Sequence, residues 1–347
     1  MKTVLVTGGC GFIGSHTVCE LVKNNYKVII VDNFVNSDRS VIDNIEKIIG
    51  NEITVYEFDV SDKETMSNVF KAHNITSVIH FAALKSVSES IKNPLQYYNN
   101  NIVSTLALLD VMKANNCRDL IFSSSATVYG TSKSPLMEDD QTGIGITNPY
   151  GQTKYMMEKI LEDFARSFNN ECSITSLRYF NPVGAHKSGL IGESPKNIPT
   201  NLMPFIINVA LQNNHNTIIG NSFNELKIFG RFYNTIDGTC IRDYIHVVDL
   251  AKAHVLALTP LKQSRKGYNV YNIGTGKGTS VLGLVEKFKK VNNVKVPYVF
   301  SERREGDLEE VYCNADRAYE ELGWVAELTI DDMCRDSMNF IREKSSL

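Results

Sequence analysis

The chain has 347 residues, 43% of them hydrophobic, which is enough for one large α/β domain and a smaller one. Its formal net charge of −3 argues against nucleic acid or an anionic membrane as a partner. Seven scattered cysteines without Cys-x-x-Cys, no zinc-type histidine spacing, no leader peptide and no membrane-length apolar run predict a soluble, cytoplasmic protein with reduced thiols and no metal.

The first predicted elements are a strand, a glycine loop and a helix. Residues 3–7 are apolar and rich in β-branched side chains, which is typical of a buried parallel strand. A helical pattern starts at residue 12, and Gly8-Gly9-Cys10-Gly11-Phe12-Ile13-Gly14 joins the two with dinucleotide-binding spacing. Such glycines permit a tight turn and close approach to a pyrophosphate, whose oxygens bind N–H groups at the helix N-terminus.

An acidic residue follows at the expected distance. Asp32 ends a second apolar strand, expected at 27–32, roughly 20 residues beyond the glycines. A carboxylate in this position accepts hydrogen bonds from the ribose hydroxyls of adenosine and repels a 2′-phosphate. The two strands and their loop therefore predict an NAD site.

Strands and helices continue to alternate as far as residue 123. We expect further strands at 53–58, 77–82 and 119–123, and helices at 12–24, 39–49, 62–73 and 95–115. This alternation predicts an α/β fold with a doubly wound, Rossmann-type parallel sheet. Ligands of such sheets bind at the carboxyl ends of the strands, where the strand order reverses.

Three polar residues near those strand ends have two interpretations each. Asp59 would meet an adenine amine or cap the following helix. Lys85 would reach a ribose or phosphate, or lie on the surface. Asn100, near the start of a long helix, would be a ligand or a cap.

Candidate catalytic residues follow the fifth strand. A run of serines, Ser123-Ser124-Ser125, leaves that strand. Asn148-Pro149 then begins a helix expected at 149–169, because Asn caps helices and Pro fits their first position. Tyr150 and Lys154 lie four residues apart, on one face of its first turns.

The Tyr-x-x-x-Lys spacing occurs three times, so spacing alone does not identify the pair. Tyr129/Lys133 contains a glycine in a loop, and Tyr155/Lys159 faces another side of the helix. Only the pair at the helix start can face the strand ends.

The chemistry expected of Tyr150 follows from charge. A free phenol, with a pKa near ~10, is a poor base at neutral pH. A lysine ammonium and a nicotinamide cation nearby favour the phenolate and lower that pKa. Tyr150 would then remove a hydroxyl proton while hydride leaves the same carbon, and Ser125 would hold that hydroxyl.

The strict alternation ends after a strand near 173–180, and the following residues are rich in Asn, Gly and Pro. We expect an NAD-binding Rossmann domain at 1–180, with a return segment at about 236–258, and a substrate-binding domain at 181–347, a smaller α+β unit with a helix near 202–213. Four of its arginines are candidates for neutralising a diphosphate, although most surface arginines do not: Arg231, Arg242, Arg303 and Arg304.

These motifs together resemble the extended short-chain dehydrogenase/reductase superfamily, and closely its UDP-glucose (UDP-galactose) 4-epimerases. The matching blocks are residues 6–16, 31–33, 80–85, 123–130, 148–154, 177–186, 201–204, 238–247 and 303–307. Dehydratases of this superfamily carry an Asp-Glu pair after the catalytic hydroxyl residue. This chain has Ala126-Thr127 there, which favours epimerisation.

The resemblance implies an isomerase that interconverts UDP-glucose and UDP-galactose by NAD-dependent oxidation and re-reduction at C4. Another NAD-dependent sugar-nucleotide oxidoreductase or decarboxylase is the alternative. The resemblance also implies a homodimer formed through the helices at 95–115 and 149–169, and three catalytic residues: Ser125, Tyr150 and Lys154.

The resemblance further implies two sets of binding residues. The residues implied for NAD are Gly8, Gly11, Phe12, Ile13, Gly14, Asp32, Asn33, Phe34, Val35, Asn36, Ser37, Asp59, Val60, Phe81, Ala82, Lys85, Asn100, Ser123, Tyr150, Lys154 and Phe180. Those implied for the UDP-sugar are Lys85, Ser125, Tyr150, Tyr179, Asn181, Asn201, Leu202, Lys227, Ile228, Phe229, Arg242, Arg304, Asp307 and Val311.

Two features depart from the family pattern or vary within it. Residues 214–224 look like an insertion before the block at 226–230. Val311 matches the position where a bulky tyrosine excludes N-acetylated sugars and a smaller residue admits them. The resemblance therefore implies activity on UDP-GlcNAc and UDP-GalNAc as well, unless Val311 only packs and its neighbours close the pocket.

Overall fold

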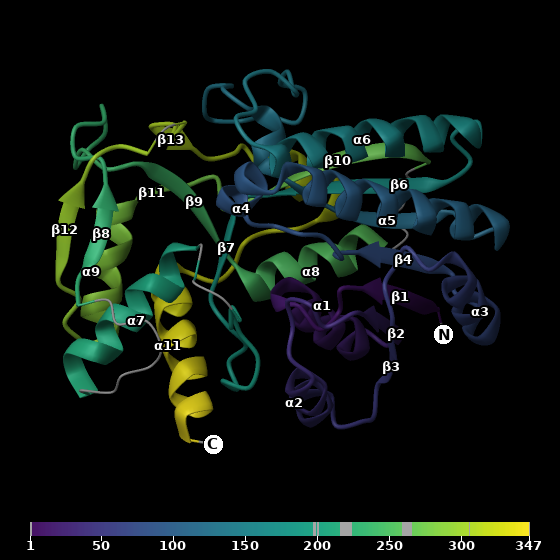
Figure 1. The fold of residues 1–347 in the computed structure, drawn as a ribbon, viewed down its shortest axis with the longest axis horizontal. Coiled ribbons are helices and arrows are strands. Elements are labelled where there is room, and N and C mark those ends of the chain that lie inside the picture. The colour runs from purple at the N-terminus through teal and green to yellow at the C-terminus, as the bar shows by residue number, and fades with distance from the viewer. Residues whose placement is uncertain are drawn as a thin grey trace.

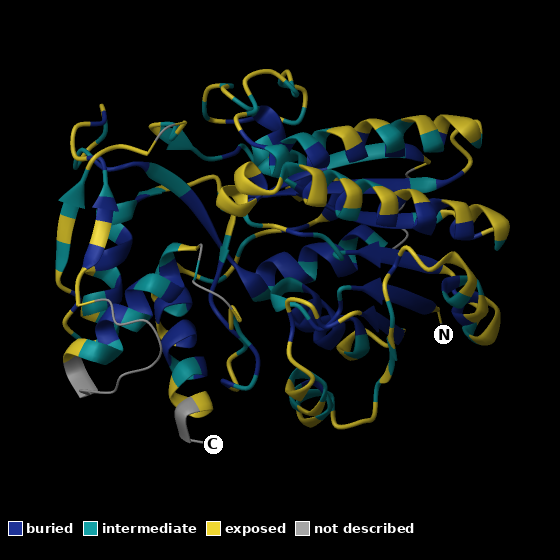
Figure 2. Cartoon of the chain, viewed as in Figure 1, coloured by how far each residue is buried: buried dark blue, intermediate teal, exposed yellow. Residues whose placement is uncertain are grey.

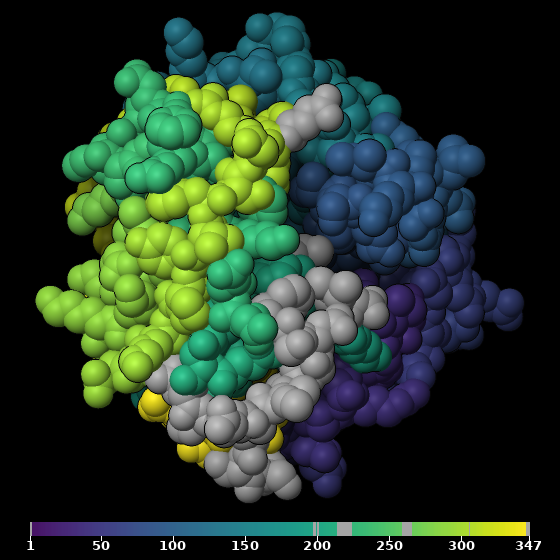
Figure 3. Space-filling view, turned by 60° about the vertical axis from the view of Figure 1, so that its left-hand side comes forward, coloured from purple at the N-terminus to yellow at the C-terminus, as the bar shows by residue number. Residues whose placement is uncertain are grey.

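The computed structural model describes residues 2–196, 199, 201–215, 224–258, 266–304 and 306–346. Most of the insertion expected at 214–224 lies outside the described residues. The earlier part of the chain, purple to blue, lies on one side of the molecule, and the later part, green to yellow, on the other (Figure 3).

A seven-stranded parallel sheet organises the first part, with the strand order β10-β6-β5-β4-β1-β2-β3. Its strands are β1 (Thr3–Thr7), β2 (Lys27–Asp32), β3 (Thr54–Glu57), β4 (Ser77–His80), β5 (Asp119–Ser125), β6 (Ser173–Tyr179) and β10 (Gly267–Ile273). The order reverses between β1 and β4, so ligands are expected to bind beyond the carboxyl ends of these strands. The predicted doubly wound sheet is confirmed.

Helices cover both faces of this sheet (Figure 1). They are α1 (Phe12–Lys23), α2 (Ser40–Ile49), α3 (Lys63–His73), α5 (Pro94–Ala114), α6 (Pro149–Ser167) and α8 (Val247–Leu258), with a short α4 (Val87–Lys92) and a 3-10 turn η1 (Ala126–Tyr129). The helices expected between 12 and 115 are present within two residues at each end, but α4 was not predicted.

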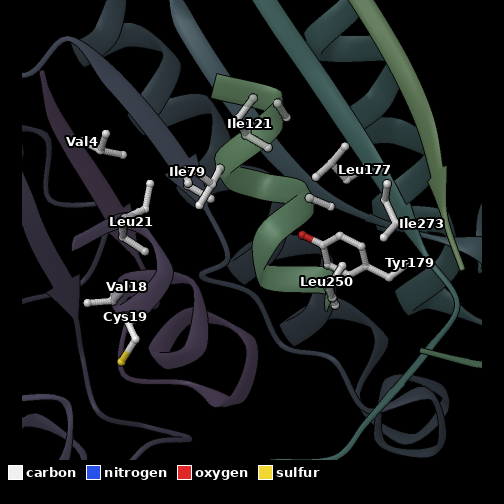
Figure 4. Close-up of a cluster of buried hydrophobic side chains, with 14 of the residues drawn as sticks. Val4, Val18, Cys19, Leu21, Ile79, Ile121, Leu177, Tyr179, Leu250 and Ile273 are labelled. Carbon is white, nitrogen blue, oxygen red and sulfur yellow. The ribbon is translucent and has the colours of Figure 1, made fainter. Parts of the chain in front are cut away.

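Side chains alternate between the two faces of β1 and fill two separate cores. Val4 and Val6 pack with Leu21 of α1 and Leu250 of α8 (Figure 4). Leu5 points to the opposite face, into a core shared with α3, α5 and α6. Strands buried on both faces in this way read as continuous apolar runs, which is why the sequence located them.

The start of α6 follows the predicted signals. Asn148 accepts a hydrogen bond from the Gly151 N–H at 2.8 Å, and Pro149 occupies the first helical turn. The cap fixes where the helix starts, and with it the position of Tyr150.

The second part is built on two small sheets. In the first, β9 (Ile241–His246) pairs with β7 (Asn181–Val183), β11 (Gly278–Ser280) and β13 (Glu310–Val311). The second consists of β8 (Leu226–Phe229) and β12 (Tyr298–Ser301), and a separate core joins these sheets to α7 (Leu202–His215), α9 (Val281–Asn292) and α11 (Ile330–Ser346). The sequence predicted α7 but not the shorter strands.

The chain passes between the two parts repeatedly. After β9, α8 packs on α1, and β10 then completes the large sheet by pairing with β6. The chain later returns once more as α10 (Asp316–Leu322), which packs against α8 and β10. The large sheet thus takes a strand from beyond the return segment expected at 236–258. Among the described residues, no helix combines the length and apolar surface needed to cross a bilayer.

Candidate active site

A cleft of about 1260 Å³ runs past the carboxyl ends of the strands of the large sheet. Segments from both parts of the chain form its wall. The predicted site residues in that wall are Gly8, Gly11, Phe12, Ile13, Gly14, Asp32, Asn33, Val35, Asn36, Ser37, Asp59, Val60, Phe81, Ala82, Lys85, Asn100, Ser123, Ser125, Tyr150, Lys154, Tyr179, Phe180, Asn181 and Asn201. The structure therefore gathers the proposed cofactor residues and the catalytic candidates in one place.

The glycine loop is packed too closely to accept side chains. A Cβ at Gly14 would lie 2.3 Å from the carbonyl oxygen of Gly8. Gly8 has a φ of +67°, and a Cβ there would lie 2.8 Å from the Ala82 nitrogen of the neighbouring β4 loop. Helix α1 begins after Gly11, which provides no side-chain cap, so the first N–H groups remain available to an anion.

Asp32 ties the glycine loop to the loop after β2. Its Oδ2 accepts a hydrogen bond from the Cys10 N–H at 3.0 Å. Its Oδ1 accepts from the Phe34 N–H and the Ser37 hydroxyl, both at 2.9 Å. A carboxylate offers about four acceptor positions, so one remains for a ligand hydroxyl.

Phe34, in contrast, is buried and absent from the cleft wall.

Segment 189–196 contacts the cofactor side of the cleft through two side chains. Lys196 donates a hydrogen bond from Nζ to the Phe34 carbonyl at 2.7 Å, and Glu193 forms an ion pair with Lys85 at 3.5 Å. The same carboxylate accepts from Asn201 Nδ2 at 2.5 Å. Segment 189–196 thus runs across the cleft. Sequence reasoning missed Glu193 and Lys196, because nothing local marks a loop that closes over a distant one.

The helix-cap interpretations of Asp59 and Asn100 are wrong. Asp62, not Asp59, caps α3 by accepting from the Thr65 N–H. Asp59 accepts hydrogen bonds from Ser61 and from the Asn33 amide. Asn100 lies inside α5, beyond its first turn, since that helix begins at Pro94.

The three catalytic candidates lie together at the end of β5 and the start of α6. Lys154 donates from Nζ to the Ser123 carbonyl at 2.6 Å, and its Nζ lies 5.8 Å from the centre of the Tyr150 ring. The Ser125 hydroxyl lies on the same side, near enough to the Tyr150 phenol to lower its pKa. Tyr129 and Tyr155 do not join them: Tyr129 donates to Asn272 in the core.

The expected lowering of the Tyr150 pKa is not found in the protein alone. Burial raises the pKa of this phenol to about 12, and the nearby Ser125 hydroxyl only partly opposes that rise. Burial also lowers the pKa of Lys154 to about 7, against the opposing charge of Glu158. Because burial favours the uncharged amine of Lys154, this side chain does not offset the burial of Tyr150; its Nζ donates to the Ser123 carbonyl and stands 4.8 Å from the Phe122 ring centre.

The remaining predicted substrate residues form a separate group. Within the described residues, the cleft wall does not include Leu202, Lys227, Ile228, Phe229, Arg242, Arg304, Asp307 or Val311. Arg242 and Asp307 form an ion pair at 3.5 Å, and the Arg304 guanidinium lies 3.9 Å from the Phe229 ring centre. Val311 stands beside Arg242 in the register of β13 and β9 and packs in a small core with Tyr129 and Phe180.

The other two candidate arginines already have partners. The Arg231 guanidinium lies 4.9 Å from the Phe300 ring centre, and that of Arg303 lies 4.0 Å from the Tyr233 ring centre. Like Arg242 and Arg304, neither lines the cleft in the described residues, and a contact with a diphosphate stays a prediction for all four. Nor does any group of three His, Cys, Asp or Glu side chains there have the arrangement of a metal site.

Comparisons with known proteins agree with this geometry. The profile of the NAD dependent epimerase/dehydratase family matches residues 4–274. A UDP-glucose 4-epimerase of Bacillus subtilis (strain 168) is 47% identical over 96% of this chain and 95% of its own length, and that of Mus musculus is 44% identical over 100% and 98%.

Solved structures give the same result. The crystal structure of UDP-glucose 4-epimerase from Bifidobacterium longum in complex with NAD+ and UDP has a TM-score of 0.91 and 48% identity, covering 99% of each chain. That of Stenotrophomonas maltophila, with bound NAD and formylated UDP-arabinopyranose, has a TM-score of 0.93 and 44% identity, covering 100% of this chain and 99% of its own. The chain therefore belongs to the NAD dependent epimerase/dehydratase family, among the UDP-glucose 4-epimerases.

Proposed function

We propose that this protein interconverts UDP-glucose and UDP-galactose through NAD-dependent oxidation and re-reduction at C4. The observation that carries the proposal is the grouping of Ser125, Tyr150 and Lys154 in the wall of the cleft that also contains the glycine loop. Relatives named UDP-glucose 4-epimerase, 44–48% identical over nearly the whole chain, support it.

The cleft residues fit NAD. The uncapped start of α1 at Gly11 offers N–H groups to a pyrophosphate, and Asp32 retains one acceptor position for a ribose hydroxyl. A volume of about 1260 Å³ exceeds the roughly 300–1,000 Å³ typical of small-ligand pockets, which suits a dinucleotide together with a sugar. We propose that NAD is bound by the predicted NAD-binding residues that line this cleft.

Bound NAD would supply a hydride acceptor that also returns the hydride. The protein's own residues handle the proton. Tyr150, once ionised to the phenolate, takes the proton of the sugar 4-hydroxyl on its oxygen and later returns it, while the nearby Ser125 hydroxyl holds the sugar hydroxyl in place. Lys154, held by the Ser123 carbonyl, places its amine beside the phenol. Because the hydride is returned to the same carbon, no net redox change results, and the returned proton restores the hydroxyl.

Substitution of Tyr150 tests this function. Tyr150→Phe should reduce the conversion of UDP-galactose by at least ~100-fold, since it removes the proton-transfer group. Tyr155→Phe is the matched control, because Tyr155 belongs to the other Tyr-x-x-x-Lys pair of the same helix and should leave the rate unchanged. The assay follows UDP-glucose formation without a consumed oxidant.

The alternative reaction gives a different signal. A net oxidoreductase or decarboxylase on this scaffold would accumulate NADH in step with product, whereas an epimerase shows no steady change in nicotinamide absorbance. NADH formed in a stoichiometric amount would contradict the proposed epimerisation, even if the Tyr150→Phe substitution abolished the conversion of UDP-galactose.

We also propose that UDP-GlcNAc and UDP-GalNAc are substrates, on the basis of the small side chain at Val311. Val311→Tyr should abolish UDP-GalNAc turnover and retain UDP-galactose turnover, because the larger ring would occupy the space of the N-acetyl group. Comparing kcat/KM for both substrates in the two proteins checks this. Equal turnover of UDP-GalNAc by both would mean that Val311 only packs in its core.

Two further properties are proposed with their support. A homodimer through α5 and α6 is supported by the exposed apolar side chains of these adjacent helices: Leu95, Val103, Leu106 and Met156. A cytoplasmic location is supported by the seven cysteines, all of which are buried and unpaired.

A further inference from the structure

Ser124, between two residues of the proposed site, has a partner outside it. Its hydroxyl donates to Glu158 Oε1 at 2.5 Å, and both residues are almost fully buried. Ser124 reaches the cleft wall, whereas Glu158 does not. Glu158 follows Lys154 by one turn of α6, so the two side chains lie on the same helix face.

A buried ion pair fixes the position of Glu158. Arg178 of β6 donates from Nε to Oε1 at 3.0 Å and from Nη2 to Oε2 at 2.8 Å, with both side chains about 5% exposed or less. Arg178 is itself held by Nη1, which donates to the Tyr129 hydroxyl at 2.9 Å and to the Glu138 carbonyl at 3.1 Å. Held at both oxygens, the carboxylate cannot turn freely.

The end of β5 is therefore attached to α6 at two points, one helical turn apart. Lys154 binds the carbonyl of Ser123, and Glu158 binds the hydroxyl of Ser124. The hydroxyl of the next residue, Ser125, lies near the Tyr150 phenol and lowers its pKa. A shift of the middle serine would move both of its neighbours, because they share its backbone.

We propose that Glu158, held by Arg178, is a positioning residue that sets the placement of Ser123 and Ser125 through its hydrogen bond to Ser124. This inference rests on the proposed epimerase function. Glu158 touches no reacting group itself. A buried ion pair alone is weak evidence of stabilisation, since well-packed apolar residues often replace one at no cost. The additional hydrogen bond to a residue between two site residues is what points to positioning.

The test removes that single hydrogen bond and keeps the ion pair. Ser124→Ala should lower kcat for UDP-galactose about tenfold with KM within about twofold, because misplaced groups slow the chemical step more than binding. Ser176→Ala is the matched control: Ser176 is a buried serine of the adjacent β6, bonded to the Tyr268 hydroxyl at 2.9 Å. It should leave kcat unchanged while altering the melting temperature to a similar extent.

Two outcomes would overturn the proposal. One is a Ser124→Ala protein with wild-type kcat. The other is a fall in kcat together with a rise in KM and a fall in melting temperature, which a merely structural role would produce. Ser124→Thr, which restores a hydroxyl, should recover most of the rate.

A crystal structure of the Ser124→Ala protein provides a readout that does not depend on activity. The Ser123 carbonyl and Ser125 hydroxyl should be displaced from Lys154 and Tyr150, and unchanged positions would contradict the inference. If the wild-type protein does not epimerise UDP-galactose, the proposed function fails, while this structural comparison still decides whether Ser124 and Glu158 position the segment.

Discussion

Burial acts in opposite directions on the two ionisable side chains of the Tyr-x-x-x-Lys pair. It raises the pKa of the Tyr150 phenol to about 12 and lowers the pKa of Lys154 to about 7. Both shifts favour the neutral forms at neutral pH, so the chain by itself does not generate a phenolate. A positive charge brought by a ligand is therefore needed to activate Tyr150.

The Lys154 shift has a measurable effect on stability. Between about pH 7 and 10.5 the unfolded chain holds a proton that folded Lys154 has released, so the free energy of unfolding should rise with pH. Urea unfolding of cofactor-free protein should show a steeper rise for wild type than for Lys154→Met. Lys159→Met, which changes an exposed lysine of the same helix, should keep the wild-type slope. A Lys154→Met slope equal to that of wild type would show that Lys154 is not buried as the structure places it.

Single residues were predicted best where local chemistry identifies them. Tyr150 was separated from Tyr129 and Tyr155 by the helix start at Asn148-Pro149, which the structure has at that place. The effect of burial on the Tyr150 pKa was not predicted, because burial depends on contacts with residues far away in sequence. Glu158 carried no local signal either, since its partners Ser124 and Arg178 lie in two other elements.

At the scale of elements, the closest packing in the site is that of α1 against the glycine loop. A Cβ on Gly14 would lie 2.3 Å from the Gly8 carbonyl, a backbone atom that cannot move aside without displacing the turn. Gly14→Ala should therefore either unfold the protein or weaken NAD binding, because the added methyl group displaces the turn that approaches the pyrophosphate. NAD titration and a melting curve measure the two effects.

The control for that substitution is a glycine without neighbours. Gly50 ends α2 with a φ of +72°, and a Cβ there meets nothing within 4 Å. Gly50→Asn should cost about 1 kcal/mol or less, because Asn tolerates the left-handed region. NAD affinity equal in Gly14→Ala and wild type would show that α1 can retreat without cost.

Elements of the first part were predicted best. Strands β1 to β6 and helices α1, α2, α3, α5 and α6 have enough residues to show a period, and their ends agree within a few residues. In the second part, α9 and α11 were not predicted although they are as long as α1 or longer. β7, β11 and β13 have only two or three residues each, too few for any pattern. β10 pairs with β6, although the chain leaves the large sheet after β6 and returns to it only at β10. No local sequence pattern predicts which strand will pair with a strand so far along the chain.

At the scale of the whole molecule, the outer surfaces of α5 and α6 carry the proposed interface. Exposed residues occur along both helices (Figure 2), and among them Leu95 is 81% and Val103 45% exposed. A charged pair, Val103→Glu with Leu106→Glu, should convert a dimer into a monomer, because two desolvated carboxylates would face each other across the interface. Sedimentation velocity measures this change.

Ile236 supplies the control, since it is 93% exposed and far along the chain in the second part. Ile236→Glu should leave the sedimentation coefficient unchanged. A wild-type protein that already sediments as a monomer would contradict the proposed dimer.

The repeated passage of the chain between its two parts limits how they can come apart. α8, β10 and α10 return to the large sheet after the chain has left it, so each part contains pieces from well-separated stretches of sequence. A protease that cut a surface loop between α7 and α10 would therefore produce two fragments, each contributing strands or helices to both halves. Neither fragment would correspond to a complete half, and the nicked protein would be held together by its cores.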